Sequence, residues 1–378
     1  MRTAAVLLNS DRSSLVEAFG QQDHVFGAAY SILQEAIEQH AFPGASVSVT
    51  FGNGIIALKT FGRFTYEIDS PAVDPTTLFD LASLTKVLAT TSMAMALYER
   101  GLLDLDARVA AVVPEFLQGE PDNRRRDVSL RMLLAHSSGL PAYEKLFLKA
   151  RTRDELLRAV FTMPLTADPG SRTEYSDIGF MLLGTALERL ADESLDGFCQ
   201  REIFAPIGMI NTTFNPPKEI RAKIPPTADD RSFRHRVIQG EVQDENSSVL
   251  GGVAAQAGVF STALDLARFA HSMLGVGRSI LRPETIGVFT KRESAPAGTS
   301  RALGWDTPSA PSQSGRYFNP TAFGHLGYTG TSLWIDPDRR LSITLLTNRT
   351  WPDCSNRAIK QVRPKFHDAV IEAIEKSA

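Results

Sequence analysis

The sequence predicts an α+β fold in which the two ends of the chain build one antiparallel sheet around a mainly helical insertion. Paired strand-like runs lie near the N-terminus, at residues 45–61, and near the C-terminus, at residues 331–347. Between them, residues 102–208 follow the apolar spacing of helices. Strands and a helix at each end, with helices in the middle, are typical of an α+β arrangement.

The N-terminal part of the sheet is predicted to be a hairpin that follows a helix. Residues 26–40 have helical apolar spacing, which ends before Phe42-Pro43-Gly44. Residues 45–51 then alternate between apolar and other side chains, and a second strand at 55–61 follows across Gly52-Asn53-Gly54. Two such runs joined by glycine and asparagine are a typical hairpin signal.

The middle of the chain is predicted to hold helices at residues 128–136, 153–163 and 177–192. Residues 215–251 are rich in proline, charge and turn residues, so we expect an irregular excursion there. A second loop-like stretch covers residues 292–322. Long loops are usually functional or disordered, and we expect these two to be walls of a site.

The C-terminal part returns to the sheet. Residues 261–274 have the pattern of a helix, and strands at 331–335 and 341–347 flank Asp336-Pro337-Asp338. The chain ends in an amphipathic helix at residues 364–376.

The composition describes an ordinary soluble globular protein with a large core. The chain has 378 residues, a formal charge of −3 and a hydrophobic content of 43%. The charge is nearly balanced and no long basic run is present, which argues against nucleic acid as a partner. No stretch is long and apolar enough to span a membrane, so no membrane partner is expected. The oligomeric state is left open.

Neither a cofactor nor a metal is implied by the sequence. Cys199 and Cys354 lie far apart and are interpreted as two free thiols. The histidines outside the motifs described below have no metal-ligand spacing. There is no P-loop, no Gly-x-Gly-x-x-Gly after a strand and no Gly-x-Ser-x-Gly elbow.

The N-terminus favours a cytoplasmic location. The apolar run 4–8 stops at Asn9, and charges follow at Asp11 and Arg12. A secretory signal has a longer apolar region. A chain already trimmed of its signal would look similar, so export stays an alternative.

The stretch Asp80-Leu81-Ala82-Ser83-Leu84-Thr85-Lys86 carries the first candidate site residues. Ser83 and Lys86 are three residues apart, which places both side chains on one helix face. The residues from Val87 to Tyr98 carry no charge, so this helix is expected to be buried and to end at Gly101. We interpret Ser83 as a nucleophile and Lys86 as its activating partner. Taken alone, the motif fits equally well a capping serine and a lysine that reaches solvent.

Two further motifs supply candidate partners. Tyr175-x-Asp177 lies at the start of a predicted helix, and His325-x-Gly327 lies in a glycine-spaced segment that opens a strand. In this order and at these spacings, the three motifs closely resemble the serine β-lactamase and penicillin-binding-protein superfamily. The resemblance is to the class C β-lactamase-like branch, which includes DD-peptidases and family VIII carboxylesterases, and it runs from about residue 32 to 348.

The resemblance implies a class C β-lactamase-like fold and an active site between two domains. The sheet domain would comprise residues 1–82 and 252–378, and the mainly helical domain residues 83–251. It also implies an oxyanion hole made by the backbone N–H groups of Ser83 and Tyr328.

The motif residues have chemical roles that can be argued individually. Tyr175 would take the Ser83 proton if the Lys86 ammonium lowers the phenol pKa, and it would later activate the deacylating water. Gly327 would let substrate lie close to the strand.

His325 and Asp177 depart from the pattern of the family. Many relatives have lysine at the position of His325, and class C β-lactamases have asparagine at the position of Asp177. His325 is mostly neutral at pH 7, so we expect less demand for a substrate carboxylate; the alternative is a structural histidine bonded to Tyr175 or a loop. Asp177 is expected to contact substrate or pair with Lys86, which argues against efficient β-lactam hydrolysis. Its alternative role is a helix cap.

The favoured function is a serine hydrolase that cleaves small esters or amides through an acyl-enzyme on Ser83. The alternatives with the same chemistry are a penicillin-binding protein or DD-peptidase, a weak β-lactamase and an acyltransferase. A non-enzymatic acyl sensor and an inactive scaffold rank lower, because no membrane anchor is predicted and every catalytic position is filled. The physiological substrate and its stereochemistry are left open.

Overall fold

The computed structural model describes residues 16–119 and 121–377, and it confirms the predicted α+β class. The N-terminal stretch on which the expected location rests lies outside these residues. Across the described ranges, none of the helices combines the length and apolar character needed to cross a bilayer.

The main sheet has six strands in the order β1-β3-β2-β11-β10-β9. Its neighbours are antiparallel except for the short first strand, which runs parallel to β3. The N-terminal hairpin and the C-terminal strands are therefore adjacent, as predicted, through pairing of β11 with β2. The strands are β1 (Val16–Glu17), β2 (Gly44–Phe51), β3 (Gly54–Gly62), β9 (Phe323–Leu326), β10 (Ser332–Asp336) and β11 (Leu341–Thr347).

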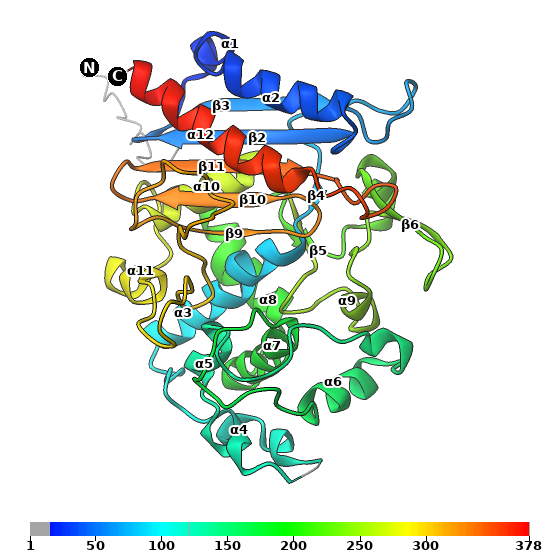
Figure 1. Ribbon diagram of the computed structural model, residues 1–378, viewed down its shortest axis with the longest axis vertical. Helices are drawn as coiled ribbons and strands as arrows, with labels where there is room; N and C mark the ends of the chain where they lie inside the picture. The colour runs from blue at the N-terminus through cyan, green and yellow to red at the C-terminus, as the bar shows by residue number, and fades with distance from the viewer. Residues whose placement is uncertain (1–15, 120, 378) are drawn as a thin grey trace, which may run out of the picture.

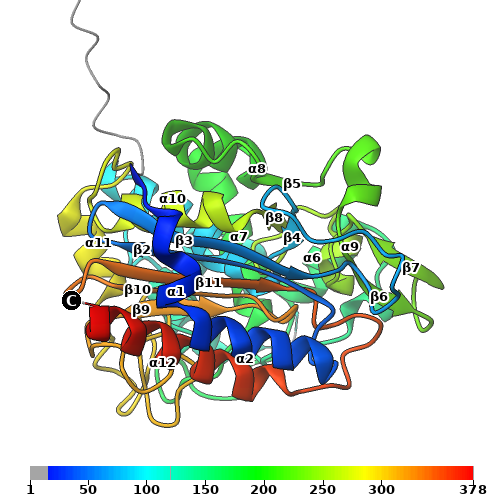
Figure 2. The ribbon, with the colours of Figure 1, turned by 90° about the horizontal axis from the view of Figure 1, so that it is seen from above.

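Helices cover both faces of this sheet. Helices α2 (Gly27–Glu38) and α12 (Ile359–Ser377) lie side by side across one face, and α10 (Ala263–Met273) lies on the other (Figure 1). The view from above shows the three layers, with the sheet between α10 and the two terminal helices (Figure 2). The apolar side chains of β2 and β11 that face α2 and α12 form one of the two large cores.

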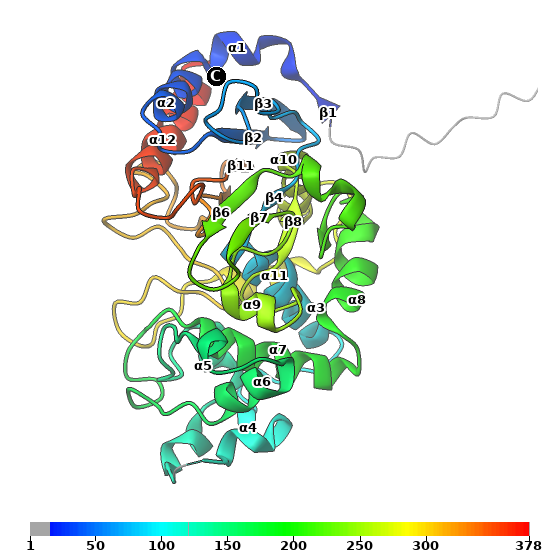
Figure 3. The same cartoon turned by 90° about the vertical axis from the view of Figure 1, so that its right-hand side faces the viewer.

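The other large core joins the helical part of the chain to the second face of the sheet. The helical part lies below the sheet, with α4 farthest from it (Figure 3). Its helices are α3 (Ser92–Glu99), α4 (Val109–Val112), α5 (Leu130–Leu134), α6 (Arg153–Phe161), α7 (Asp177–Ala191), α8 (Leu195–Cys199), α9 (Glu245–Val249) and α11 (Pro283–Thr290). The division into two domains at residues 82 and 252 stays a prediction.

Several of these helices begin where a hydroxyl side chain accepts a backbone N–H. Ser129, Thr152, Ser176 and Thr262 cap α5, α6, α7 and α10 in this way. Such caps satisfy one of the N–H groups that a helix start leaves unpaired. They fix the start of α7, and with it the position of the Tyr175 segment.

The excursion at 215–251 is more regular than predicted. It contains a hairpin of β6 (Pro226–Asp230) and β7 (Arg236–Gln239), followed by α9. The Asp230 carboxylate holds the turn, because it accepts the N–H groups of Phe233 and Arg234 at 2.9 and 3.1 Å. The two strands were not predicted because they are short and polar and lack the alternating apolar pattern from which strands are recognised.

Two helix boundaries also differ from expectation. α12 begins at Ile359, five residues before the predicted start, and contains Pro364 within it. Buried Ile359 and Arg363 anchor the additional turn. The Ser83 helix is not uniform: a 3₁₀ turn, Ala82–Leu84, is followed by a π-helical turn, Lys86–Thr91, before α3 begins. Such irregular turns are frequent at functional sites.

Candidate active site

Ser83 lies in a tightly held turn that follows β4 (Phe79–Asp80). The buried Asp80 carboxylate accepts the N–H groups of Ala82, at 2.8 Å, and Gln243, at 2.7 Å. Burial raises the pKa of Asp80 to about 6. Ala82 has a φ of 46°, in the left-handed region that alanine rarely adopts. A strained residue that is held by its surroundings directly before a serine is typical of a functional turn.

The Ser83 hydroxyl contacts both predicted partners. Its Oγ lies 2.8 Å from the Tyr175 hydroxyl and accepts a hydrogen bond from Lys86 Nζ at 3.0 Å. Tyr175 comes from the loop before α7, and Lys86 from the π-helical turn. Three side chains separated by up to 92 residues therefore meet at one oxygen atom.

Lys86 is fully buried, with 0% of its side chain exposed, so the alternative in which it reaches solvent is wrong. Besides Ser83, its Nζ contacts the Gln256 carbonyl oxygen at 3.0 Å and Asp177 Oδ1 at 2.7 Å. Burial opposes the charge, but the Asp177 carboxylate and the Tyr175 hydroxyl outweigh it and raise the pKa of Lys86. The ammonium is thus charged at neutral pH.

The Tyr175 phenol is not acidified, contrary to the expectation. Its pKa is raised, because burial and the Asp177 carboxylate together outweigh the opposing effect of Lys86. The ring is packed on several sides: the His136 and His325 ring centroids lie 4.6 and 5.9 Å away. Tyr175 is therefore a rigidly held neutral phenol at neutral pH.

Asp177 does not cap α7. Ser176 is the capping residue, and its Oγ accepts the Gly179 N–H at 2.9 Å. The Asp177 carboxylate instead forms the ion pair with Lys86. The alternative of a capping aspartate is wrong, and the predicted pairing with Lys86 is present.

The turn at residues 327–331 is bound directly to the Ser83 turn. Thr331 Oγ1 donates to the Leu81 carbonyl at 3.0 Å, and Thr329 Oγ1 donates to the Asp80 carbonyl at 2.7 Å. A Cβ on Gly327 would lie 1.9 Å from Thr331 Oγ1 and 2.5 Å from the Leu81 oxygen, so only glycine fits there. Glycine thus permits the close approach of the strand to the serine.

The backbone N–H groups of Ser83 and Tyr328 are available for a ligand. Among the described residues, neither N–H has a protein acceptor. Unpaired N–H groups are uncommon when they are buried, and at a cleft they are ready to bind an anionic oxygen.

His325 lies in β9 and lines the same cleft. Its Nδ1 contacts the Leu326 carbonyl oxygen at 2.8 Å, and because a carbonyl only accepts, Nδ1 carries the proton. Its Nε2 is buried without a partner in the described residues. Burial and the nearby Lys86 and Arg301 charges lower the pKa of His325 well below its usual value. His325 is therefore a neutral imidazole in the cleft, and its Nε2 can accept a hydrogen bond.

The cleft that contains Ser83 has a volume of about 610 Å³. Basic side chains dominate its wall, and the sequence motifs did not indicate them. They are Arg301, Arg349, Arg357, Lys360 and Arg363. Arg301 comes from the predicted wall at 292–322, and the others come from residues 349–363, which carried no prediction. Asp306, the acidic lining residue, lies 3.7 Å from Arg301. None of the residues that line this cleft comes from 215–251.

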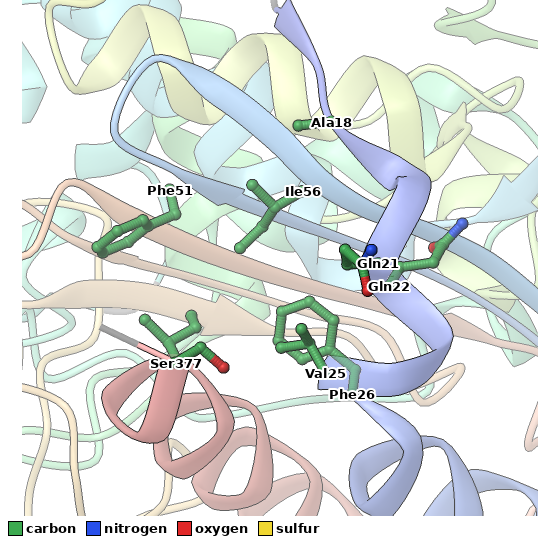
Figure 4. A pocket seen from close by; sticks show the side chains of 9 residues that line it. Ala18, Gln21, Gln22, Val25, Phe26, Phe51, Ile56 and Ser377 are labelled. Atoms are coloured by element: carbon green, nitrogen blue, oxygen red, sulfur yellow. The ribbon is translucent and has the colours of Figure 1, made fainter.

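A second cavity lies at the far end of the sheet domain and carries no chemistry. It is an apolar groove of about 240 Å³, between α1 (Gln22–Val25), the end of α12 and the hairpin of β2 and β3. Phe26, Phe51 and Ile56 point into it, with Gln21, Gln22 and Ser377 as its polar residues (Figure 4). It has no titratable side chain in its lining, and the site is assigned to the cleft where Ser83 contacts Tyr175 and Lys86.

Comparison with known proteins identifies the family. The β-lactamase family model matches residues 29–363. The chain is 33% identical to an N-acetylmuramyl-L-alanine amidase of Bacillus subtilis (strain 168) over 345 residues, which covers 82% of this chain and 77% of the amidase. It is 31% identical to a putative D-alanyl-D-alanine carboxypeptidase of Escherichia coli (strain K12), with 82% and 79% covered.

A solved structure confirms the class C-like fold that the motifs predicted. The class C β-lactamase from Rhodobacter sphaeroides superposes with a TM-score of 0.71 at 23% identity, and the match covers 92% of this chain and 99% of that one. The family match extends over the turn of Ser83, the Tyr175 segment and the 327–331 turn. The chain therefore belongs to the β-lactamase family, as a hydrolase with a class C-like fold.

Proposed function

We propose that the protein cleaves small carboxylic esters or amides through a covalent acyl-enzyme on Ser83. The contact of the Ser83 hydroxyl with both Tyr175 and Lys86, at 2.8 and 3.0 Å, carries this proposal. A serine held against a base and a cation in a cleft is the arrangement that an activated nucleophile needs.

In acylation, Ser83 Oγ attacks the acyl carbon while its proton passes to the oxygen of Tyr175 in its ionised, phenolate form, which the raised pKa makes the minor form at neutral pH. The carbonyl oxygen becomes an oxyanion between the N–H groups of Ser83 and Tyr328. The oxyanion then collapses, the bond to the leaving group breaks, and Tyr175 returns the proton to the departing oxygen or nitrogen. Lys86 stabilises the phenolate that accepts the Ser83 proton and that is restored when the proton passes to the leaving group, because its ammonium is buried beside the Tyr175 ring.

Deacylation repeats these steps with water as the nucleophile. Tyr175 takes a proton from water, which attacks the acyl carbon, and the proton then returns to Ser83 as the acid leaves. An acyltransferase would use an acceptor alcohol or amine in place of water, with the same residues. The cleft has to admit that acceptor, and its basic wall selects which molecules enter.

A first-choice experiment is a time course with a short-chain p-nitrophenyl ester. Sustained turnover supports a hydrolase. A burst of one product per enzyme followed by a stall would point to slow deacylation, and then to a penicillin-binding or transferase role. A weak β-lactamase would show slow but sustained hydrolysis of a β-lactam.

The Asp177→Asn variant tests the electrostatics of the site. Since the base must be ionised and its pKa is raised, we expect kcat/KM to increase with pH through the neutral range in the wild type. Removing the Asp177 charge leaves the Lys86 ammonium unopposed, which lowers the pKa of Tyr175. The rising limb of the pH profile should move to lower pH by about one to two units.

The control for this variant is Asp106→Asn, which removes an exposed carboxylate that pairs with Arg131. Its pH profile should match the wild type. A profile that does not move in Asp177→Asn would contradict the proposed base.

A second candidate is an amidase or carboxypeptidase that acts on anionic peptide fragments. The basic wall of the cleft favours it, because four of its cations come from the single stretch 349–363. The names of the two relatives, an amidase and a putative carboxypeptidase, also support it. A carboxylate on the substrate would then be bound by Arg357 and Lys360, the two exposed cations of this stretch, while His325 stays neutral.

Matched substrates decide whether the cleft prefers negative charge. If the acyl side of the scissile bond faces the cations, we expect p-nitrophenyl hemisuccinate to be favoured over p-nitrophenyl butyrate. If the leaving-group side faces them, we expect an acyl-thioglycolate to be favoured over its methyl ester. The double variant Arg357→Ser with Lys360→Ser should reduce that preference about tenfold, and added salt should weaken it.

The control is Lys365→Ser, which removes an exposed cation of α12 that does not line the cleft. Equal preference for charged and neutral substrates in the wild type, on both sides of the bond, would remove the second candidate and leave the first.

A further inference from the structure

Arg363 of α12 is a buried cation whose partners are backbone carbonyl groups. It is 4% exposed, and Nη2 donates to the Gly327 oxygen at 2.6 Å and to the Thr331 oxygen at 3.0 Å. Nε donates to the Gly330 oxygen at 3.2 Å, and Nη1 donates to Gln313 Oε1 at 2.9 Å. One guanidinium thus binds the turn 327–331 at three of its carbonyl groups.

Burying this charge has a cost in folding free energy. No aspartate or glutamate in the described part of the chain pairs with Arg363, and burial together with the Arg349 charge lowers its pKa to about 9. It therefore remains positive at neutral pH. A buried charge without a counter-ion is among the less favourable groups in a protein interior. Neutral hydrogen-bonding side chains would stabilise the same turn without this cost.

The position of the Gly327 carbonyl links this charge to the Tyr328 N–H. The Gly327 oxygen and the Tyr328 N–H belong to one planar peptide group, in which a trans bond directs them in opposite directions. A donor that fixes the oxygen on the Arg363 side therefore fixes the N–H on the opposite side. A charge-assisted bond to the oxygen also polarises the peptide, which makes its N–H a stronger donor.

The next peptide group is held in the same manner. Arg349 Nε donates to the Tyr328 carbonyl oxygen at 2.6 Å, and its Nη1 donates to the Cys354 oxygen at 3.2 Å. Both peptide groups that flank the Tyr328 Cα are thus restrained by a guanidinium. Tyr328 itself is half exposed, so packing of its side chain does not account for its backbone position.

We propose that Arg363 is a positioning residue for the oxyanion hole: it orients and polarises the Gly327–Tyr328 peptide so that the Tyr328 N–H binds the transition-state oxygen. This inference rests on the proposed acyl-enzyme function. It assigns to the C-terminal helix a part in catalysis, although Arg363 contacts no reacting atom. Because the N–H binds the oxyanion more strongly than the substrate carbonyl, the effect of Arg363 falls on kcat.

The test compares Arg363→Met and Arg363→Lys with Lys365→Met, which removes an exposed charge from the same helix. For each protein, kcat and KM are measured with a p-nitrophenyl ester, and the inhibition constant of an alkyl boronic acid is measured as a mimic of the tetrahedral adduct on Ser83. Thermal unfolding reports the stability of each variant.

We expect Arg363→Met to lower kcat by roughly 10- to 100-fold with KM within about twofold, and to weaken the boronic acid by a similar factor. Arg363→Lys keeps the charge and reaches fewer carbonyl groups, so it should recover part of the loss in both kcat and boronic acid affinity. Lys365→Met should match the wild type.

Three results would overturn the inference: unchanged kcat in a folded Arg363→Met, equal losses in Arg363→Lys and Arg363→Met, or a lower kcat with unchanged boronic acid affinity. Its failure is distinct from failure of the proposed function. In the latter case the wild type itself shows neither ester turnover nor boronic acid binding that depends on Ser83.

Discussion

Replacing Ser83 by alanine is expected to abolish turnover and covalent labelling. The substitution removes the oxygen atom that contacts both Tyr175 and Lys86, and no other hydroxyl takes its place in the geometry described. Loss of a serine nucleophile typically costs a factor of at least about 10³ in kcat, and up to about 10⁶. The measurement is the rate of p-nitrophenyl ester hydrolysis together with mass spectrometry after treatment with a fluorophosphonate or a β-lactam.

Ser31→Ala is the matched control, because Ser31 is exposed on α2 and does not line the cleft. The control should be labelled at Ser83 like the wild type. Labelling of the Ser83→Ala protein at another residue would show that the nucleophile is misassigned. Unfolding of this variant is not expected, since the Ser83 turn is held by Asp80 and by the threonines of the 327–331 turn.

The pairing of Ser83 with Lys86 was predictable because it is local. Three residues of helix separate them, and both helical and 3₁₀ geometry bring such neighbours together. The same reasoning identified the hairpin of β2 and β3, whose turn residues are typical. The contact of Tyr175 with Ser83 was available only through the family resemblance, because no local rule joins residues 92 positions apart.

The sheet shows where alternation misleads. Ser46, Ser48 and Thr50 of β2 alternate with apolar residues, a pattern typical of a strand with one side in solvent, yet all three are buried and α10 packs on this strand. Ser48 Oγ donates to the Ala263 carbonyl at 2.8 Å, and the Thr50 and Ser342 hydroxyl groups pair at 2.6 Å. Small hydroxyl side chains that satisfy one another can be buried at little cost, and the sequence alone does not distinguish them from exposed ones.

The basic wall and the Arg363 contacts were beyond sequence reasoning for another reason. Arginines at 349, 357 and 363 occur in an unremarkable polar stretch, and only the fold brings them to the cleft. The direction of the Tyr175 pKa shift is similarly a sum of opposed effects, in which burial and Asp177 exceed Lys86. Such a balance depends on distances and burial that no motif contains.

Replacing Tyr175 by phenylalanine is expected to lower kcat by about 10²- to 10⁴-fold while the fold stays intact. The substitution keeps the ring that packs between His136 and His325 and removes only the hydroxyl that contacts Ser83 Oγ. Without a phenol to ionise, the remaining activity should also lose the rise with pH expected for the wild type. The measurements are kcat/KM across the neutral and alkaline range, and thermal unfolding.

Tyr98→Phe is the matched control, because the Tyr98 ring packs against Phe289 in the helical part and does not line the cleft. It loses the same hydroxyl without affecting the proton path. Near-normal turnover in Tyr175→Phe would show that another group takes the Ser83 proton, and Lys86 is the only other side chain in contact with that oxygen among the described residues. The pH profile separates the two cases: since the Lys86 pKa is raised, a lysine base would leave a rising limb in the Tyr175→Phe variant, and a tyrosine base would not.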